Sequence, residues 1–173
     1  WGLSIFDVII ILAYVLGVAI DQGEAEGETK LTLQFADISE KSAKSGSGTS
    51  RSKEEGGSSY INVSNSGTDI NTIIRGFEHM ISRRVYIPHN QVIVISEEFA
   101  REGVRDSIDF FARAQEARMT LYMLVSKGSA AAILEASPVF EKTPANELAE
   151  MLRGQKVTSE IPIVSEFEFA RTL

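Results

Sequence analysis

The feature that most constrains the fold is the alternation of strand-like and helix-like segments between residues 60 and 135. Apolar runs that suit strands occur at 60–64, 91–96 and 118–128, and helical patterns separate them. A strand followed by a helix and a second strand forms a crossover unit, so this order predicts parallel neighbours in one sheet. The run at 118–128 is apolar on both faces, which predicts a central strand.

The helical segments carry start and stop signals. The first follows Gly67, where Thr68 or Asp69 can act as the N-cap. Its apolar residues recur at the spacing of an amphipathic helix, in the order Ile70, Ile73, Ile74, Phe77 and Ile81. Four further helices are predicted, and glycine ends the first and the last of them; they cover 97–103, 104–117, 129–136 and 144–154.

An apolar run near the amino end, from Ile5 to Ile20, raises the question of a membrane span. A helix over these 16 residues would reach only ~24 Å, whereas a spanning helix needs about 20 residues to cross ~30 Å of hydrocarbon. We therefore predict a helical turn that runs into a buried strand. The segment 30–38 alternates apolar and polar side chains, so the two runs predict an antiparallel hairpin with its turn at 21–28.

Residues 39–59 contain eight serines, four glycines and no large apolar side chain. Such a segment buries too little surface to offset its ordering entropy, so we predict a disordered, mobile insertion within a domain that covers 1–173. The other segments predict an α+β fold close to the α/β type. Its centre is a mixed β-sheet of about five strands, with helices packed against it.

The composition argues against several classes of function. Seventeen basic and 24 acidic residues give a net charge of −7, and a nucleic-acid partner would need a basic surface. The chain has no cysteine and only two histidines, ten residues apart, which leaves no cysteine chemistry and no HExxH metal site. It also lacks the motifs of a nucleophile elbow, a phosphate loop or a dinucleotide fold. We expect no enzyme activity, no cofactor, no bound metal and no nucleic acid.

The stretch 81–96 gathers polar side chains directly before a buried strand. Arg83, Arg84, Tyr86 and His89 form a cluster of donors, which we place on a loop at one end of the sheet. Guanidinium groups bind carboxylates and phosphates in bidentate geometry, so the cluster is a candidate surface for a partner or ligand. Alternatively, the basic residues stabilise a helix C-terminus while a proline directs the chain into the next strand. Helix and turn chemistry alone favour this structural interpretation.

A second candidate is the junction "SKGSAAAI" at 126–133, where a strand passes through glycine into a helix. The free amides at a helix start could hold an anion. A turn with Ser129 as the N-cap explains the same residues, and we favour that interpretation.

The stretch from 81 to 134 resembles the Ger(x)C family, the C subunits of spore nutrient germinant receptors. In that family a helix ends in a serine–arginine–arginine–aromatic run and a histidine precedes the next strand, matched here by Ser82, Arg83, Arg84, Val85, Tyr86 and His89. Two later motifs are matched by Ile108, Asp109 and Phe110 and by Tyr122, Val125, Lys127 and Gly128. The amino end, Trp1 and "YVLGVAID", fits the family as well.

This resemblance implies a lipoprotein subunit on the outer face of the spore inner membrane, in a complex with the receptor's A and B subunits. It implies that 1–173 is the N-terminal domain of a larger, multi-domain protein without enzyme activity. The lipid would be carried by a cysteine immediately before Trp1 in the precursor, and acyl chains would then supply the membrane anchor. We expect a role in receptor assembly or signalling. The alternative is a soluble domain that binds the germinant through 83–89.

Overall fold

An antiparallel hairpin forms the centre of the sheet. The computed structural model describes residues 12–37, 59–114 and 121–155 of the 173-residue chain. Strands β1 (Leu12–Gln22) and β2 (Thr29–Ala36) pair antiparallel over most of their length. The hairpin predicted from the alternating apolar side chains is therefore confirmed.

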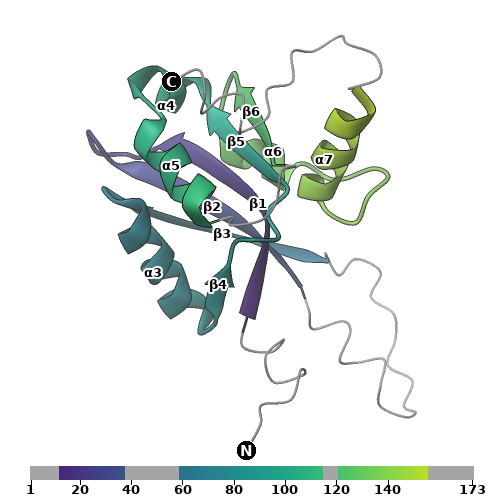
Figure 1. Cartoon of the computed structure of the whole chain (residues 1–173), viewed down its shortest axis with the longest axis horizontal. Coiled ribbons are helices and arrows are strands. Elements are labelled where there is room, and N and C mark those ends of the chain that lie inside the picture. Colours follow the sequence, from purple (N-terminus) through teal and green to yellow (C-terminus); the bar gives the residue numbers. More distant parts are fainter. Residues whose placement is uncertain (1–11, 38–58, 115–120, 156–173) are drawn as a thin grey trace, which may run out of the picture.

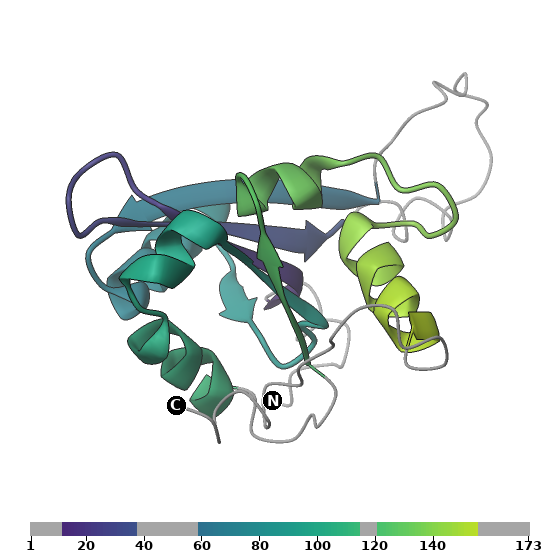
Figure 2. The same cartoon turned by 90° about the horizontal axis from the view of Figure 1, so that it is seen from above.

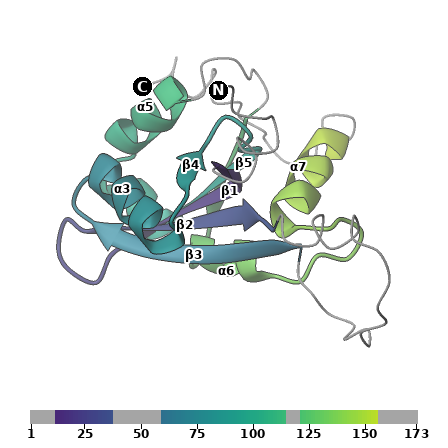
Figure 3. The ribbon, with the colours of Figure 1, turned by 90° about the horizontal axis from the view of Figure 1, so that it is seen from below.

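Four more strands extend this hairpin into one mixed sheet: β3 (Tyr60–Gly67), β4 (Arg84–Tyr86), β5 (Val92–Ser96) and β6 (Tyr122–Ser126). Within the described residues the order is β3-β2-β1-β5-β6, and β4 lies beside the start of β1, as Figure 3 shows. Strand β3 is antiparallel to β2, whereas β4 and β5 run parallel to β1, and β6 runs parallel to β5. The predicted mixed sheet with packed helices is confirmed.

Helix α3 (Ile70–Ile81) follows β3 and begins where the sequence predicts. The Asp69 carboxylate accepts a hydrogen bond from the backbone N–H of Thr72 (2.9 Å), and this bond lowers the pKa of Asp69. Ser82, in the left-handed conformation with φ 52°, ends the helix. The residues of the predicted stripe that become buried are Ile70, Ile73 and Phe77.

The helices cover both faces of the sheet. Figure 1 shows α3, α4 and α5 on one side, and α6 and α7 on the other. Side chains of β1 alternate between the two sides: Val18 and Ile20 join the apolar cluster under α3, α4 and α5, whereas Ala19 joins the cluster under α6 and α7. The bounds of these helices are α4 (Glu97–Glu102), α5 (Arg105–Ala114), α6 (Ala130–Glu135) and α7 (Pro144–Gln155).

The prediction of a central strand at 118–128 is wrong. Strand β6 is the last strand of the sheet among the described residues, and its neighbour on one side is β5. Its apolar character on both faces has another cause, because α4 and α6 contact it from opposite sides of the sheet. An edge strand that helices contact on both faces can be apolar on both faces like a central strand, although Val125 of β6 stays 63% exposed.

The structure also corrects smaller points. Arg84 and Tyr86 lie on strand β4 and not on a loop, which makes six strands where about five were predicted. Gly154 lies inside the last turn of α7, which continues to Gln155. The predicted helical turn before residue 12, the insertion at 39–58 and the helix end at 115–117 lie outside the described residues. Among the helices that the structure describes, none is long and apolar enough to cross a membrane.

Candidate functional site

The sequence placed its candidate site before β5, and the structure brings two of the four residues together. Tyr86, on β4, lies against His89, with ring centroids 5.5 Å apart. Both rings also meet Tyr14 of β1, at 5.4 Å from Tyr86 and 5.2 Å from His89. The result is a half-buried cluster of three aromatic rings at the start of β1.

Tyr14 is the member of this cluster that sequence reasoning missed. It pairs with Tyr86 across the parallel register of β1 and β4. Because β4 is only three residues long, no local pattern predicts this pairing. The available signal is a lone tyrosine among the aliphatic residues 12–20 of β1.

Arg83 and Arg84 behave differently from the rings. Both side chains are exposed, and neither forms an ion pair with a residue that the structure describes. The polar contact between β4 and α3 is made by other residues: the backbone N–H of Val85 donates a hydrogen bond to Oε1 of Glu78 (3.2 Å). The two guanidinium groups are therefore open to solvent, and their assignment to a partner or ligand surface stays a prediction.

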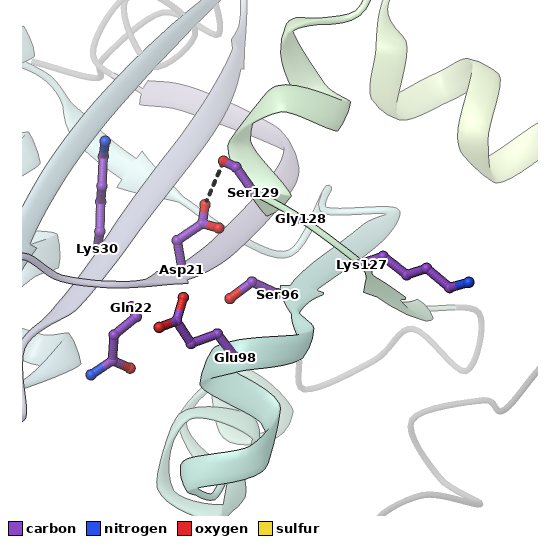
Figure 4. A pocket seen from close by; sticks show the side chains of 8 residues that line it. All are labelled: Asp21, Gln22, Lys30, Ser96, Glu98, Lys127, Gly128 and Ser129. Carbon is purple, nitrogen blue, oxygen red and sulfur yellow. Dashed lines mark hydrogen bonds between the residues drawn. The ribbon is translucent and has the colours of Figure 1, made fainter.

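The opposite end of β1 is where an open α/β sheet usually binds ligands. Strands β1, β5 and β6 are parallel, so their carboxyl ends, at Gln22, Ser96 and Ser126, lie at one edge. The helices that follow β5 and β6 turn to opposite faces, and the crevice between them is the usual place for a ligand in such folds. A cavity of about 310 Å³ lies there, and Figure 4 draws the eight residues that line it.

Asp21 holds the most buried charge at this edge, and the fold uses it internally. Its carboxylate accepts hydrogen bonds from the backbone N–H groups of Ala130 (2.6 Å) and Ala131 (2.9 Å) and from Oγ of Ser129 (3.4 Å). The junction at 126–133 therefore does hold an anion, and that anion is the chain's own aspartate. Ser129 also acts as the predicted N-cap, since its Oγ accepts from the N–H of Ala132 (3.4 Å).

The serines at this edge are also engaged. Oγ of Ser96 accepts from the backbone N–H of Phe99 and so caps α4, while Oγ of Ser126 donates to the carbonyl of Gly128 (2.7 Å). Lys30 and Lys127 extend away from the cavity (Figure 4). Asp21, Ser96, Ser126 and Ser129 thus start helices or shape turns at this edge. One buried acceptor stays open: Oε1 of Gln22 has no hydrogen-bond partner among the described residues.

Catalytic chemistry needs a nucleophile with its base, or a set of metal ligands. Among the described residues no group of three or more histidines, aspartates or glutamates gathers in a way that could hold a metal ion. The geometry defines an α+β domain in which Asp21, Ser96 and Ser129, at the carboxyl ends of the parallel strands, bond to the starts of its own helices.

Comparison with known proteins names the class. The family described as "Spore germination protein N-terminal domain" matches residues 10–173, so the chain belongs to that family. Two relatives come from Bacillus subtilis (strain 168). YfkR is 27% identical over 140 residues, which cover 81% of this chain and 35% of the relative. The spore germination protein YndF is 30% identical over 135 residues, which cover 69% of this chain and 33% of the relative.

The chain thus spans about a third of the length of the curated relatives it matches. No solved structure matches it.

Proposed function

We propose that this protein acts as a non-enzymatic subunit of a spore nutrient germinant receptor, where it supports receptor assembly or signalling together with the A and B subunits. The observation that carries the proposal is the family match over residues 10–173. It covers nearly the whole chain, and the relative YndF is itself named as a spore germination protein.

The use of polar groups supports a non-enzymatic role. Asp21, Ser96 and Ser129 lie where an α/β enzyme would place its chemistry, and each of them caps a helix. An enzyme of this architecture would keep such groups free for substrate. A subunit that works through its surfaces has no such need.

The proposed location follows from the same resemblance. A cysteine preceding Trp1 in the precursor would carry the lipid and hold the subunit on the outer face of the spore inner membrane. One acyl chain binds a bilayer only marginally, and two or more hold a protein stably. Fractionation of spores with Cys→Ala at that precursor position tests this step. Retention of the variant in the inner membrane, at an unchanged level and without the A and B subunits, would contradict it.

Two measurements separate assembly from nutrient sensing. Deletion of the gene should abolish the germination response to a nutrient and lower the amounts of the A and B subunits in spore membranes. Calorimetry of the protein with amino acids and sugars should give no heat of binding. Binding of a germinant, lost on substitution at Arg83 or Arg84 or at Gln22, would favour the alternative of a germinant-binding domain instead.

A further inference from the structure

The loop between α6 and α7 presents two adjacent large apolar side chains to solvent. Val139 is 76% exposed and Phe140 is 90% exposed. Single exposed apolar residues are common on protein surfaces, but a pair as open as this is unfavourable in an isolated domain. The loop lies at the margin of the described structure, beyond the sheet (Figure 2).

The backbone of this loop is held in place. One carboxylate oxygen of Glu147, Oε2, accepts hydrogen bonds from the backbone N–H groups of Val139 (2.6 Å) and Phe140 (3.3 Å). The carbonyl of Lys142 accepts a further bond from Oγ of Ser59 (2.7 Å), the residue immediately before β3. The two apolar side chains therefore project from ordered backbone, which lowers the entropy that binding would cost.

Both ends of the loop are fastened to the sheet by one buried residue. Nε2 of Gln34 donates to the carbonyl of Leu134 (2.9 Å), at the end of α6. Oε1 of Gln34 accepts from the backbone N–H of Ala145 (3.0 Å), at the start of α7. Asn62 adds a second bond to the Leu134 carbonyl (2.8 Å). Gln34 and Asn62 thus hold the ends of the loop against the sheet, while Val139 and Phe140 face the solvent.

A third apolar side chain extends this surface along α7. Met151 lies one helical turn after Glu147, on the same side of the helix, and is 56% exposed. We call Val139, Phe140 and Met151 the α7 patch. Three of the six large apolar side chains that are exposed in the described structure belong to it.

The charges around the α7 patch indicate what it can bind. The end of α6, the loop and α7, which carry the patch, contain four acidic residues and two basic ones, and one of the basic residues forms an ion pair with an acidic neighbour; the six are Glu135, Glu141, Glu147, Glu150, Lys142 and Arg153. The resulting net charge is 2 − 4 = −2. An acidic border opposes binding to an anionic lipid surface and suits a partner with lysine or arginine at its rim.

We propose that the α7 patch is a docking surface for another protein, with Phe140 inserted into an apolar pocket that basic residues border. Aromatic side chains at the centre of an interface contribute most of the binding free energy when a pocket encloses them. The ring of Phe140 provides the anchor, Val139 and Met151 widen the contact, and the acidic border selects the partner.

Site-specific photo-crosslinking in the full-length protein tests the surface directly. A benzoylphenylalanine at position 140, expressed in sporulating cells and irradiated in isolated spore membranes, should join a second protein at a peptide that contains apolar residues and lysine or arginine. The matched control carries the same group at Met80, which is 57% exposed on α3, on the other side of the sheet. Crosslinks only to lipid, to a second copy of this chain or to another part of the same chain would overturn the proposal, as would none at all.

A substitution series measures the contribution of the anchor. Phe140→Ala should weaken co-purification of the crosslinked partner at least tenfold, whereas Phe140→Leu should retain most of it and Met80→Ala all of it. Because the side chain is exposed, the melting temperature should stay within about 1 °C for each variant. Undiminished co-purification by Phe140→Ala would show that the ring is not the anchor.

Discussion

On the face covered by α3, α4 and α5, large apolar rings and chains fill the space between helices and sheet, among them Phe77, Phe99 and Phe111. On the face covered by α6 and α7, most of the buried helix residues are alanines. There β2 and β3 present polar side chains, and Gln34 and Asn62 bond directly to the helix backbone. Large buried apolar side chains stabilise the first face. Close packing of small residues and hydrogen bonds from the sheet to the helix backbone stabilise the second.

This difference decides how each face responds to a change. A face filled by large side chains loses stability in proportion to the volume removed. On a face fastened by a few hydrogen bonds, removing one partner leaves a buried polar group unpaired, which costs about 1–3 kcal/mol and weakens the attachment of the helices. Because the α7 patch sits on the second face, its geometry depends on hydrogen bonds made at the sheet.

The largest effect is expected on the first face. Phe77→Ala would remove a fully buried ring that packs edge-on against Phe35, with centroids 6.4 Å apart. It should lower the free energy of unfolding by about 3–5 kcal/mol. Met80→Ala, on the same helix but exposed, should change it by less than ~0.5 kcal/mol. Urea unfolding followed by circular dichroism measures both. Equal losses of unfolding free energy would show that buried apolar volume does not hold the first face together.

The next effect should be local to the second face. Gln34→Leu leaves the buried N–H of Ala145 without its acceptor and should cost roughly 3 kcal/mol. Hydrogen exchange should rise in α6 and α7 while α3 keeps its protection. Thr32→Val is the matched control, since within the described structure the Thr32 hydroxyl bonds across strands, to Oγ of Ser64 (2.8 Å), and not to a helix. Faster exchange in α3 to the same degree would show that the two faces open together.

Close approach on the second face gives a third test. A Cβ added at Gly17 would lie 2.8 Å from Cβ of Ala145 and 3.1 Å from Cδ2 of Leu134, closer than such atoms pack. Gly17→Ala should therefore lower stability by ~1–3 kcal/mol in thermal unfolding. Adding Ala145→Gly should recover part of that loss. A double variant no more stable than the single one would place the clash elsewhere.

The smallest effect concerns the exposed cap of α3. The hydrogen bond from Thr72 lowers the pKa of Asp69 in the folded protein, so this group contributes stability above its ordinary pKa of 3.8. That contribution disappears as the pH falls through the lowered value. Asp69→Asn still caps the helix, so its melting temperature should match the native protein near neutral pH and depend less on pH below 3.8. Parallel pH profiles in the acid range would contradict this.

Sequence patterns predicted the helices of both faces, but they indicated how the helices pack only on the first face. The spacing of Ile70, Ile73 and Phe77 is local, so it identified both the helix and its buried side. Gln34 and Asn62 look like ordinary polar residues on half-buried strands, because their partners lie far along the chain. The edge position of β6 was missed for a related reason: burial on both faces does not reveal how many strands are neighbours.

At the candidate site too, contacts between residues near in sequence were predicted, and contacts between distant residues were not. The order of residues around Tyr86 and His89 indicated a polar cluster, and the structure brings these two rings together. Tyr14 required the parallel register of β1 and β4, which no local pattern contains. The amides at 126–133 suggested an anion, but only the fold shows that Asp21, more than a hundred residues earlier, supplies it.

The sequence separation between Gln34 and its helix partners also determines the order in which parts of the fold can form during synthesis. Gln34 is made 100 residues before Leu134 and 111 residues before Ala145. At about 5–20 residues per second, a ribosome needs roughly 5–20 s to cover that interval. Strands β1, β2 and β3 can pair within it, while the surface that α6 and α7 will cover stays open to water. On the part of that surface that β2 and β3 contribute, Thr32, Gln34, Asn62 and Ser64 are polar, which should lower the tendency of the nascent sheet to aggregate before α6 and α7 are made.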